Sequence, residues 1–338
     1  MPDRSTLVLV ALGALIAVLL PLASYLDERS KAPRAEDVLL VSYPRSGSFW
    51  LRFLLAQAAR GDSLNIDFHN LEDIFPDLEY GPNRAVYVGA EEMSTDYKEV
   101  RRERPRVRLP EIYKSHMVHR PGAEPPCDVS VGPGLHETAC ECPNCPEKWR
   151  RVIYLVRDGR DALCSYYNFQ RNLGAENTAD GFSDFLRAES LYPGVSWAEH
   201  VRSYLDLPTP GVASGASEEG PEVLWVRYED LHADPAKELR RVLNFLGVRA
   251  TDVVIREAVR KSEFSSMREQ EEDGGLRLFD RHYSDRQEEF RVVRKGKIGS
   301  WEDCFGKNGA FEEAREAFNA ENLDVMQKLG YVESARWR

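Results

Sequence analysis

The chain has 338 residues, of which 42% are hydrophobic, and a formal net charge of -11. This length and hydrophobic content suit one large α/β domain or two small ones. The acidic balance argues against a protein that wraps a nucleic-acid backbone, because such proteins carry a basic footprint. We therefore expect no nucleic-acid partner, and an anionic ligand has to be held by local positive groups.

The N-terminal segment predicts a single membrane anchor. Residues 5–26 contain no charged side chain and, at ~1.5 Å rise per residue, are long enough to cross a hydrocarbon core of about 30 Å. A cleaved signal peptide is the alternative, but only Arg4 precedes the segment and no small-x-small cleavage site precedes Tyr25. The expected organisation is an N-terminal flank at 1–4, the anchor at 5–26, a short connector at 27–36 and the main domain at 37–331.

The charges beside this anchor bear on its orientation. Arg29, Lys31 and Arg34 follow the anchor, whereas Arg4 precedes it. Counting positive residues therefore favours a cytosolic main domain. The opposite orientation, with the domain in a Golgi-type lumen, stays open.

The first motif of the main domain is "VLLVSYPRSGSFW", which starts at Val38. Residues 38–41 read as a short buried strand, and the apolar residues from Phe49 onward recur at helical spacing. The first amides of such a helix lack intrahelical partners and carry the positive end of its dipole, so the loop between strand and helix predicts an anion site. An ordinary turn is the alternative, because Pro, Ser and Gly are common turn residues. The Gly-Lys-Ser/Thr signature of nucleotide-triphosphate loops is absent.

Two stretches follow without a regular pattern. Residues 98–120 form a basic run. We expect this run to be a solvated surface, and the alternative is that it contacts an anionic or membrane-held acceptor. Four of the cysteines cluster in residues 127–145, where they predict a loop stapled by structural zinc or by disulfides. Cys164 and Cys304 stand alone in apolar contexts.

The second half of the chain repeats the strand-loop-helix order. Residues 152–156 predict a strand that leads through Arg157, Asp158 and Gly159 into a helix. A further strand is expected within 222–231, and a helix over 235–246 opens with a proline. Residues 208–221 are rich in Gly, Ser and Pro and predict a surface loop. Alternating strands and helices imply a parallel sheet covered on both faces, with ligands at the carboxyl ends of its strands.

Taken in order, several stretches resemble one enzyme family. "SYPRSGSFW", "YKSH", "VIYLVRDGRDALCSYY", "RYEDL", "KSEFSSM" and "RKGKIGSW" resemble the motifs of sulfotransferases that use 3'-phosphoadenosine 5'-phosphosulfate (PAPS). The resemblance runs from about residue 37 to residue 330. It implies a P-loop-like α/β sulfotransferase fold and a PAPS-dependent enzyme, here behind a membrane anchor.

The resemblance also assigns residues to the two phosphate-bearing ends and the adenine of PAPS. Arg45, Ser46, Gly47, Ser48 and Phe49 would cradle the 5'-phosphosulfate. Guanidinium groups match oxyanions bidentately, so arginine suits the 3'-phosphate site as well. That site would contain Arg157, Ser165, Arg294, Lys295 and Gly296, whereas Trp50, Phe264, Ser262 and Tyr228 would surround the adenine.

His116 in "YKSH" is the candidate general base. The resemblance places it where the family's base takes a proton from the acceptor, and an imidazole with a pKa of about 6.5 suits that task. His119 is the competing residue, and Lys114 would stabilise charge on the sulfuryl oxygens. Arg45 stands where soluble relatives commonly have lysine, which puts its proton donation to the leaving oxygen in question. No metal is expected to take part in the transfer.

The predicted function is transfer of a sulfuryl group from PAPS to a hydroxyl or amine, by in-line displacement with a His base. The alternatives are a nucleotide kinase or NTPase-like enzyme, and a catalytically inactive nucleotide-binding membrane adaptor. The acceptor is expected to be a small molecule, a lipid or a glycan, and no motif selects among these. No copy of the family's dimer motif is present, so the sequence makes no prediction of oligomeric state.

Overall fold

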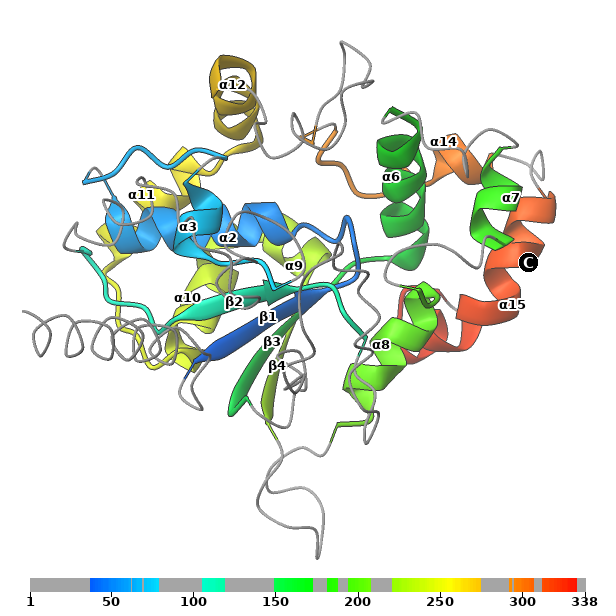
Figure 1. The fold of residues 1–338 in the computed structure, drawn as a ribbon, viewed down its shortest axis with the longest axis horizontal. Helices are drawn as coiled ribbons and strands as arrows, with labels where there is room; N and C mark the ends of the chain where they lie inside the picture. The colour runs from blue at the N-terminus through cyan, green and yellow to red at the C-terminus, as the bar shows by residue number, and fades with distance from the viewer. Residues whose placement is uncertain are drawn as a thin grey trace, which may run out of the picture.

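The described part of the chain forms a parallel sheet between two groups of helices. The computed structural model describes residues 37–61, 63–68, 70–78, 105–118, 149–172, 181–187, 194–207, 221–274, 292–293, 295–306 and 312–332. Strands and helices alternate along the sequence, and Figure 1 shows the strands at the centre with helices to either side. The predicted α/β class is therefore confirmed.

Four strands make up the sheet, all of them parallel, in the order β2-β1-β3-β4. They are β1 (Val38–Ser42), β2 (Ile112–Ser115), β3 (Arg151–Val156) and β4 (Glu222–Arg227). Because the strands run in one direction, the residues that follow them meet at one edge of the sheet. Those residues are Tyr43, His116, Arg157 and Tyr228.

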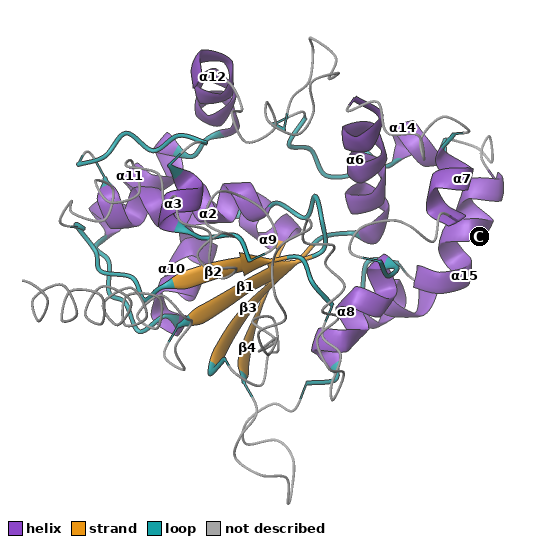
Figure 2. Cartoon of the chain, in the orientation of Figure 1, coloured by secondary structure: helices purple, strands orange, loops and turns teal. Residues whose placement is uncertain are grey.

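Both faces of the sheet are buried, as expected when helices cover a parallel sheet on each side. Leu40 and Ile153 point to one face, whereas Leu39 and Val152 point to the other. Figure 2 shows the two helical layers that cover these faces. The first layer is α2 (Ser48–Arg60), α3 (Leu71–Ile74), α9 (Tyr228–Ala233), α10 (Pro235–Phe245) and α11 (Asp252–Lys261), with α12 (Phe264–Gly274) at its margin; the second is α6 (Gly159–Asn172), α7 (Phe182–Arg187), α8 (Trp197–Leu205), α14 (Glu302–Phe305) and α15 (Glu312–Lys328).

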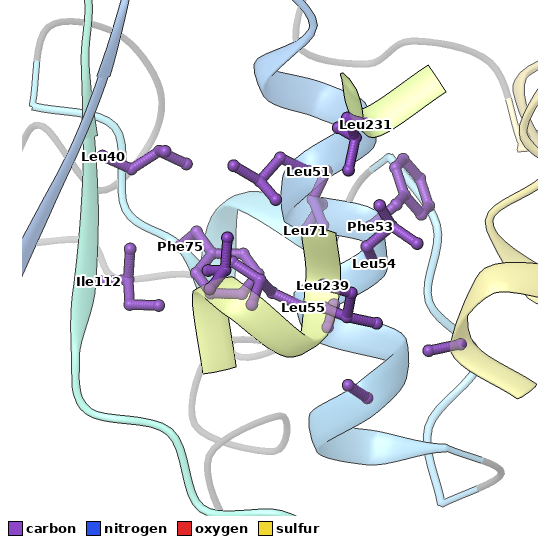
Figure 3. Close-up of a cluster of buried hydrophobic side chains, with 14 of the residues drawn as sticks. Leu40, Leu51, Phe53, Leu54, Leu55, Leu71, Phe75, Ile112, Leu231 and Leu239 are labelled. Atoms are coloured by element: carbon purple, nitrogen blue, oxygen red, sulfur yellow. The ribbon is translucent and has the colours of Figure 1, made fainter. Parts of the chain in front are cut away.

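The first layer is centred on α2, which is buried around most of its circumference. Leu51, Phe53, Leu54 and Leu55 have no exposed surface, and Figure 3 shows them among leucine and phenylalanine side chains of neighbouring elements. Burial of each such side chain contributes about 1.5–3 kcal/mol. A helix packed around most of its circumference has a fixed N-terminus, and the candidate anion loop lies there.

Three of the four strands were predicted from sequence, and β2 was not. Ile112–Ser115 lies inside the run interpreted as a solvated basic surface, yet all four of its residues are buried. That interpretation is wrong for this segment, since Lys114 is a buried strand residue rather than a surface charge. Gly159 was expected in a loop, whereas it is the first residue of α6.

The predicted anchor and two other segments lie outside the described residues. They are residues 5–26, the cysteine cluster at 127–145, and 208–220 of the predicted surface loop. Among the helices that the structure describes, none has the length and apolar character needed to cross a bilayer. The anchor, the zinc or disulfide staple and the proposed domain limits therefore stay predictions.

Candidate active site

The loop between β1 and α2 has the backbone shape of an anion site. Gly47, the residue at the N-cap of α2, has a φ of 104° and, as a glycine, offers no side chain to cap the helix. A Cβ on Gly47 would lie 2.7 Å from the ring of Tyr228, so only glycine fits there. Arg45 also has positive φ, at 67°. The first amides of α2, which have no intrahelical partners, therefore border a loop with a conformation that glycine makes possible.

The side chain of Arg45 leaves this loop and reaches α6. Its Nη2 donates to the carbonyl oxygen of Val292 at 2.7 Å, and its Nε lies 3.4 Å from Ser165 Oγ. The guanidinium also lies over the ring of Phe169, 4.6 Å from the centroid. Arg45 was assigned to the 5' end of the nucleotide, but its guanidinium is turned toward a residue assigned to the 3' end.

Arg157 connects three segments that are distant in sequence. Its Nη1 donates to the carbonyl oxygen of Arg45 at 3.2 Å, and its Nη2 to that of Lys297 at 3.0 Å. Its guanidinium lies 4.4 Å from the centre of the Tyr228 ring. The structure thus brings together the first loop, the end of β3, the end of β4 and the loop before α14, as the sequence predicted.

Asp161 holds the loop before α14 in place, and sequence analysis did not identify this residue. Its carboxylate accepts from the amides of Gly299 and Trp301, both at 2.8 Å, and from Ser300 Oγ at 3.3 Å. It also lies 3.6 Å from the Arg157 guanidinium. One carboxylate therefore orients both the loop and the arginine that this loop contacts. The only signal in the sequence is its position four residues after Arg157.

Gly296 and Phe264 pack directly against each other. Gly296 has φ 59, and a Cβ there would lie 2.4 Å from Phe264 Cδ2. Lys295, beside it, forms an ion pair with Asp303. Glu271 of α12, a second residue that sequence analysis missed, is buried and accepts from the amides of residues 292 and 293. Arg294 lies outside the described residues.

Three buried polar atoms point to a ligand at this site. Ser46 Oγ, Arg157 Nε and Ser262 Oγ are shielded from solvent and have no hydrogen-bond partner within the described part of the structure. Each such atom costs roughly 1–3 kcal/mol when unsatisfied. Atoms of Gln57, Trp197 and Gln270 also have no partner among the described residues, but they lie at positions that the resemblance does not assign to the nucleotide. Ser46, Arg157 and Ser262 come from three separate segments, all assigned to the same nucleotide by resemblance. A ligand rich in acceptor oxygens and nitrogens would satisfy them.

The aromatic residues assigned to adenine lie in two groups. The Trp50 ring is 5.7 Å from that of Tyr228, in an edge arrangement, whereas Phe264 lies at Gly296. Burial raises the pKa of Tyr228, so its hydroxyl stays protonated. Tyr228 therefore contacts Trp50, Arg157 and the position of Gly47, which makes it a hub of the site.

His116 follows β2 and lies beside the end of β1. Its Nδ1 is 2.6 Å from the backbone carbonyl oxygen of Ser42. A carbonyl only accepts, so Nδ1 carries the proton and the lone pair is on Nε2. Burial lowers the pKa of His116 well below 6.5, and the charge of Lys114 lowers it further. His116 is therefore neutral at physiological pH, in the tautomer that accepts a proton at Nε2.

Lys114, the residue expected to assist, is buried one strand position before Ser115. Its Nζ lies 2.7 Å from Asp77 Oδ2, and both side chains are less than a tenth exposed. Its ammonium is thus paired below the sheet edge and affects His116 through its charge. His119, the alternative base, lies outside the described residues.

The comparisons with known proteins agree with this geometry. The sulfotransferase domain family matches residues 143–330, which is more than half of the chain. The chain belongs to the sulfotransferase-domain family. It is thus an enzyme of the PAPS-dependent sulfotransferase class, as the motifs predicted.

Individual sulfotransferases match over most of the chain. Sulfotransferase 1E1 of Bos taurus is 26% identical over 277 residues, covering 80% of this chain and 79% of its own. Sulfotransferase 4A1 of Homo sapiens is 26% identical over 278 residues, covering 80% and 75%. Among solved structures, retinol dehydratase with androsterone and inactive cofactor PAP has a TM-score of 0.55 at 20% identity, covering 87% of this chain and 83% of that one. Mouse SULT7A1 complexed with PAP has a TM-score of 0.51 at 20% identity, covering 90% and 92%.

A disulfide connects two helices of this sulfotransferase, α6 and α14, beside the loop that precedes α14. Cys164 of α6 and Cys304 of α14 are bonded, with Cα atoms 5.8 Å apart. Sequence analysis treated these two cysteines as isolated, which was wrong, because 140 residues separate them and no spacing pattern connects them. In the chain-entropy account, closing a loop of this length contributes about 4–5 kcal/mol to stability.

Proposed function

We propose that this sulfotransferase transfers a sulfuryl group from PAPS to a hydroxyl or amine, with His116 as the general base. The observation that carries the proposal is the hydrogen bond from His116 Nδ1 to the Ser42 carbonyl oxygen. This bond directs the lone pair to Nε2 at the sheet edge where the anion loop begins. Base and loop thus meet at adjacent strand ends, β2 and β1.

The two anion-binding groups of the site fit the two ends of PAPS. The first amides of α2 and Ser46 would hold the 5'-phosphosulfate, because a helix N-terminus and its loop favour negative charge. Arg157 and Ser165 would hold the 3'-phosphate, with the loop at Lys295 and Gly296 beside them. The unsatisfied atoms of Ser46 and Arg157 support this assignment, and that of Ser262 supports a ligand at the position assigned to the adenine.

The proposed transfer is a balanced in-line displacement. Nε2 of His116 takes the proton of the acceptor hydroxyl, and the acceptor oxygen forms a bond to sulfur. The bond from sulfur to the 5'-phosphate oxygen breaks, and adenosine 3',5'-bisphosphate (PAP) leaves with the electron pair. Positive groups at the leaving oxygen are the principal stabilising device in transfers of this type. General-base catalysis adds roughly 10²- to 10⁴-fold.

The acceptor is proposed to be a small molecule with a hydroxyl group. A relative in Cavia porcellus, 26% identical over 279 residues, is named 3-alpha-hydroxysteroid sulfotransferase, and retinol dehydratase was solved with androsterone and with retinol. These proteins support an apolar hydroxyl acceptor. Labelled PAPS supplied with a hydroxysteroid, a phenol, a lipid alcohol, a glycan and a primary amine would separate the acceptor classes.

The His116→Ala variant tests the base. We expect transfer of labelled sulfuryl to fall by roughly 10²- to 10⁴-fold. The dissociation constant of PAP, measured by calorimetry, should stay within about a factor of two of the wild-type value. His119→Ala is the matched control and should keep its rate. Loss of PAP binding in His116→Ala would show a structural role, and loss of transfer only in His119→Ala would move the base to that residue.

The same assays separate the alternative functions. A kinase or NTPase would require ATP and magnesium, and the chain lacks the Gly-Lys-Ser/Thr signature of such enzymes. An inactive adaptor would bind PAP and transfer nothing to any acceptor of the panel. Arg45 in place of the more common lysine is the feature that favours the adaptor. Measurable labelled product excludes it.

The domain is proposed to work on the luminal side of a membrane. The Cys164–Cys304 disulfide supports this side, because disulfides persist in oxidising compartments and are rare in the cytosol. The charges beside the expected anchor favoured the cytosol, so the two indications differ. A reagent that cannot cross membranes, applied to sealed microsomes with and without detergent, measures the orientation of the domain. Labelling of the domain without detergent would refute the luminal side.

A further inference from the structure

His116 lies against α8 (Trp197–Leu205), a helix that no motif marks as functional. His200 has no exposed surface, and its Nε2 lies 2.9 Å from the backbone carbonyl oxygen of His116. Tyr204, one turn later, donates its hydroxyl to the carbonyl oxygen of Met117 at 3.0 Å. Two side chains on one face of α8 therefore hold two consecutive peptide groups, those of the candidate base and of the next residue.

A third residue sets the tautomer of His200. The hydroxyl of Tyr154 on β3 lies 2.7 Å from His200 Nδ1. Because a carbonyl only accepts, Nε2 of His200 must donate to His116, so Nδ1 is the acceptor and Tyr154 the donor. Burial agrees with this assignment, since it lowers the pKa of His200 to about 4 and raises that of Tyr154. Donors and acceptors thus run in one direction, from Tyr154 through His200 to His116.

His200 also contacts Tyr43, the residue next to Ser42, whose carbonyl oxygen accepts from His116. The ring of Tyr43, which follows Ser42, packs edge-on against the His200 ring with centroids 5.6 Å apart. His200 therefore borders both the peptide that carries His116 and the residue next to the carbonyl that orients its ring. A shift of His200 would change the relation between these two peptides.

The helix that carries His200 and Tyr204 is itself held firmly. Asn322 of α15 accepts from the amide of Ala198 at 3.0 Å, in a buried contact. Arg202, on the outer side, pairs with Asp324 at 2.5 Å. The buried contact fixes the start of α8 against α15, whereas the Arg202–Asp324 pair is exposed to solvent and adds little.

We infer that His200 and Tyr204 are positioning residues that hold His116 in the geometry for proton abstraction, and that Tyr154 fixes the tautomer that His200 needs. The inference rests on the proposed role of His116. It assigns His200 no contact with substrate, since its two ring nitrogens are occupied by Tyr154 and by the carbonyl of His116. Misplacement of a catalytic group by about 1 Å can reduce a rate on the order of 10²-fold.

Two substitutions at the same position separate positioning from simple structure. His200→Gln keeps an N–H close to the place of Nε2, whereas His200→Asn is polar but too short to reach the His116 carbonyl. With labelled PAPS and the fastest acceptor of the panel, we expect His200→Asn to lower kcat by roughly 10- to 100-fold. The KM for PAPS and the Kd of PAP should not change, and His200→Gln should recover most of the rate.

The same variants in the His116→Ala background show whether His200 acts through the base. There, His200→Asn should cause no further loss of the residual rate, because groups that act as a unit are not additive. Equal loss in both backgrounds, an unchanged kcat in His200→Asn, or equal rates for Asn and Gln would overturn the inference. A normal rate in His116→Ala alone would instead refute the proposed base.

A measurement without acceptor gives an independent result. In protein labelled with ¹⁵N-histidine and saturated with PAP, the His116 signal is the one lost in His116→Ala. We expect the Nδ1–H tautomer in the wild type and in His200→Gln, and a mixture of tautomers in His200→Asn; an unchanged tautomer there would contradict the inference. If His200→Asn does not fold, Tyr204→Phe replaces it, because this variant keeps the ring and loses only the hydroxyl. It should lower kcat several-fold, on the order of one lost hydrogen bond. An unchanged kcat in Tyr204→Phe would overturn the inference.

Discussion

Gly296→Ala tests whether the contact between Gly296 and Phe264 shapes the nucleotide site. A Cβ at this position would lie 2.4 Å from Phe264 Cδ2, about 1 Å closer than the ~3.5 Å at which carbon atoms normally touch. The ring must therefore move away from the loop. Stacking of an aromatic ring on a base contributes roughly 1–3 kcal/mol, so a partial loss of ~1.4 kcal/mol would raise the Kd of PAP about tenfold.

Gly299→Ala is the matched control for this experiment. Gly299 lies in the same loop with φ 76, so alanine there has the same left-handed strain as at Gly296, with φ 59, roughly 1–2 kcal/mol. However, apart from its two chain neighbours, no atom of the described residues lies within 4 Å of its added Cβ. Calorimetric titration with PAP should thus show weaker binding for Gly296→Ala than for Gly299→Ala, and Phe264→Ala should match the former. Equal Kd values for the two glycine variants would refute the reasoning.

Three further predictions follow from buried contacts. Burial lowers the pKa of His200 in the folded protein to about 4, from 6.5. Its share of stability is therefore complete above pH 6.5 and falls by roughly 3 kcal/mol as the pH drops to 4, at ~1.36 kcal/mol per pH unit. Urea unfolding at several pH values should show a shallower loss of unfolding free energy for His200→Gln. Paired Cys164→Ser and Cys304→Ser substitutions should lower the unfolding free energy by about 2–5 kcal/mol, whereas an unchanged denaturation midpoint would exclude a stabilising disulfide. Asp161→Asn should lower stability by about 2 kcal/mol, because one charged acceptor for the amides of the loop is lost, and should weaken PAP binding; unchanged affinity would mean that the loop keeps its shape without the carboxylate.

The sheet and the edge that carries the site were predictable because β1, β3 and β4 each have a local signal. A strand buried on both faces reads as a continuous apolar run, and the residues just after β1 and β3 include arginine and glycine, the residue types of an anion site. β2 has no such signal. Its burial of Lys114 depends on Asp77, 37 residues earlier in the sequence, so the lysine was interpreted as surface charge.

The residues that sequence analysis missed act across long separations. Asp161 accepts from amides 138 and 140 residues away, and Glu271 from residues 292 and 293. His200 contacts the peptide of a residue 84 positions before it. A carboxylate or imidazole in a helix has the same local pattern whether it faces solvent or a distant backbone. These contacts are consequences of the tertiary structure, and only the motifs of the family indicated where they would gather.

The absence of a side chain at Gly159 links the two halves of the site. A Cβ on this first residue of α6 would lie 2.7 Å from the Trp197 ring of α8. α6, which follows Arg157 in the chain, therefore packs directly on α8, which holds the peptide of His116. We therefore expect a change that separates these two helices to disturb the supports of Arg157 and of His116 together.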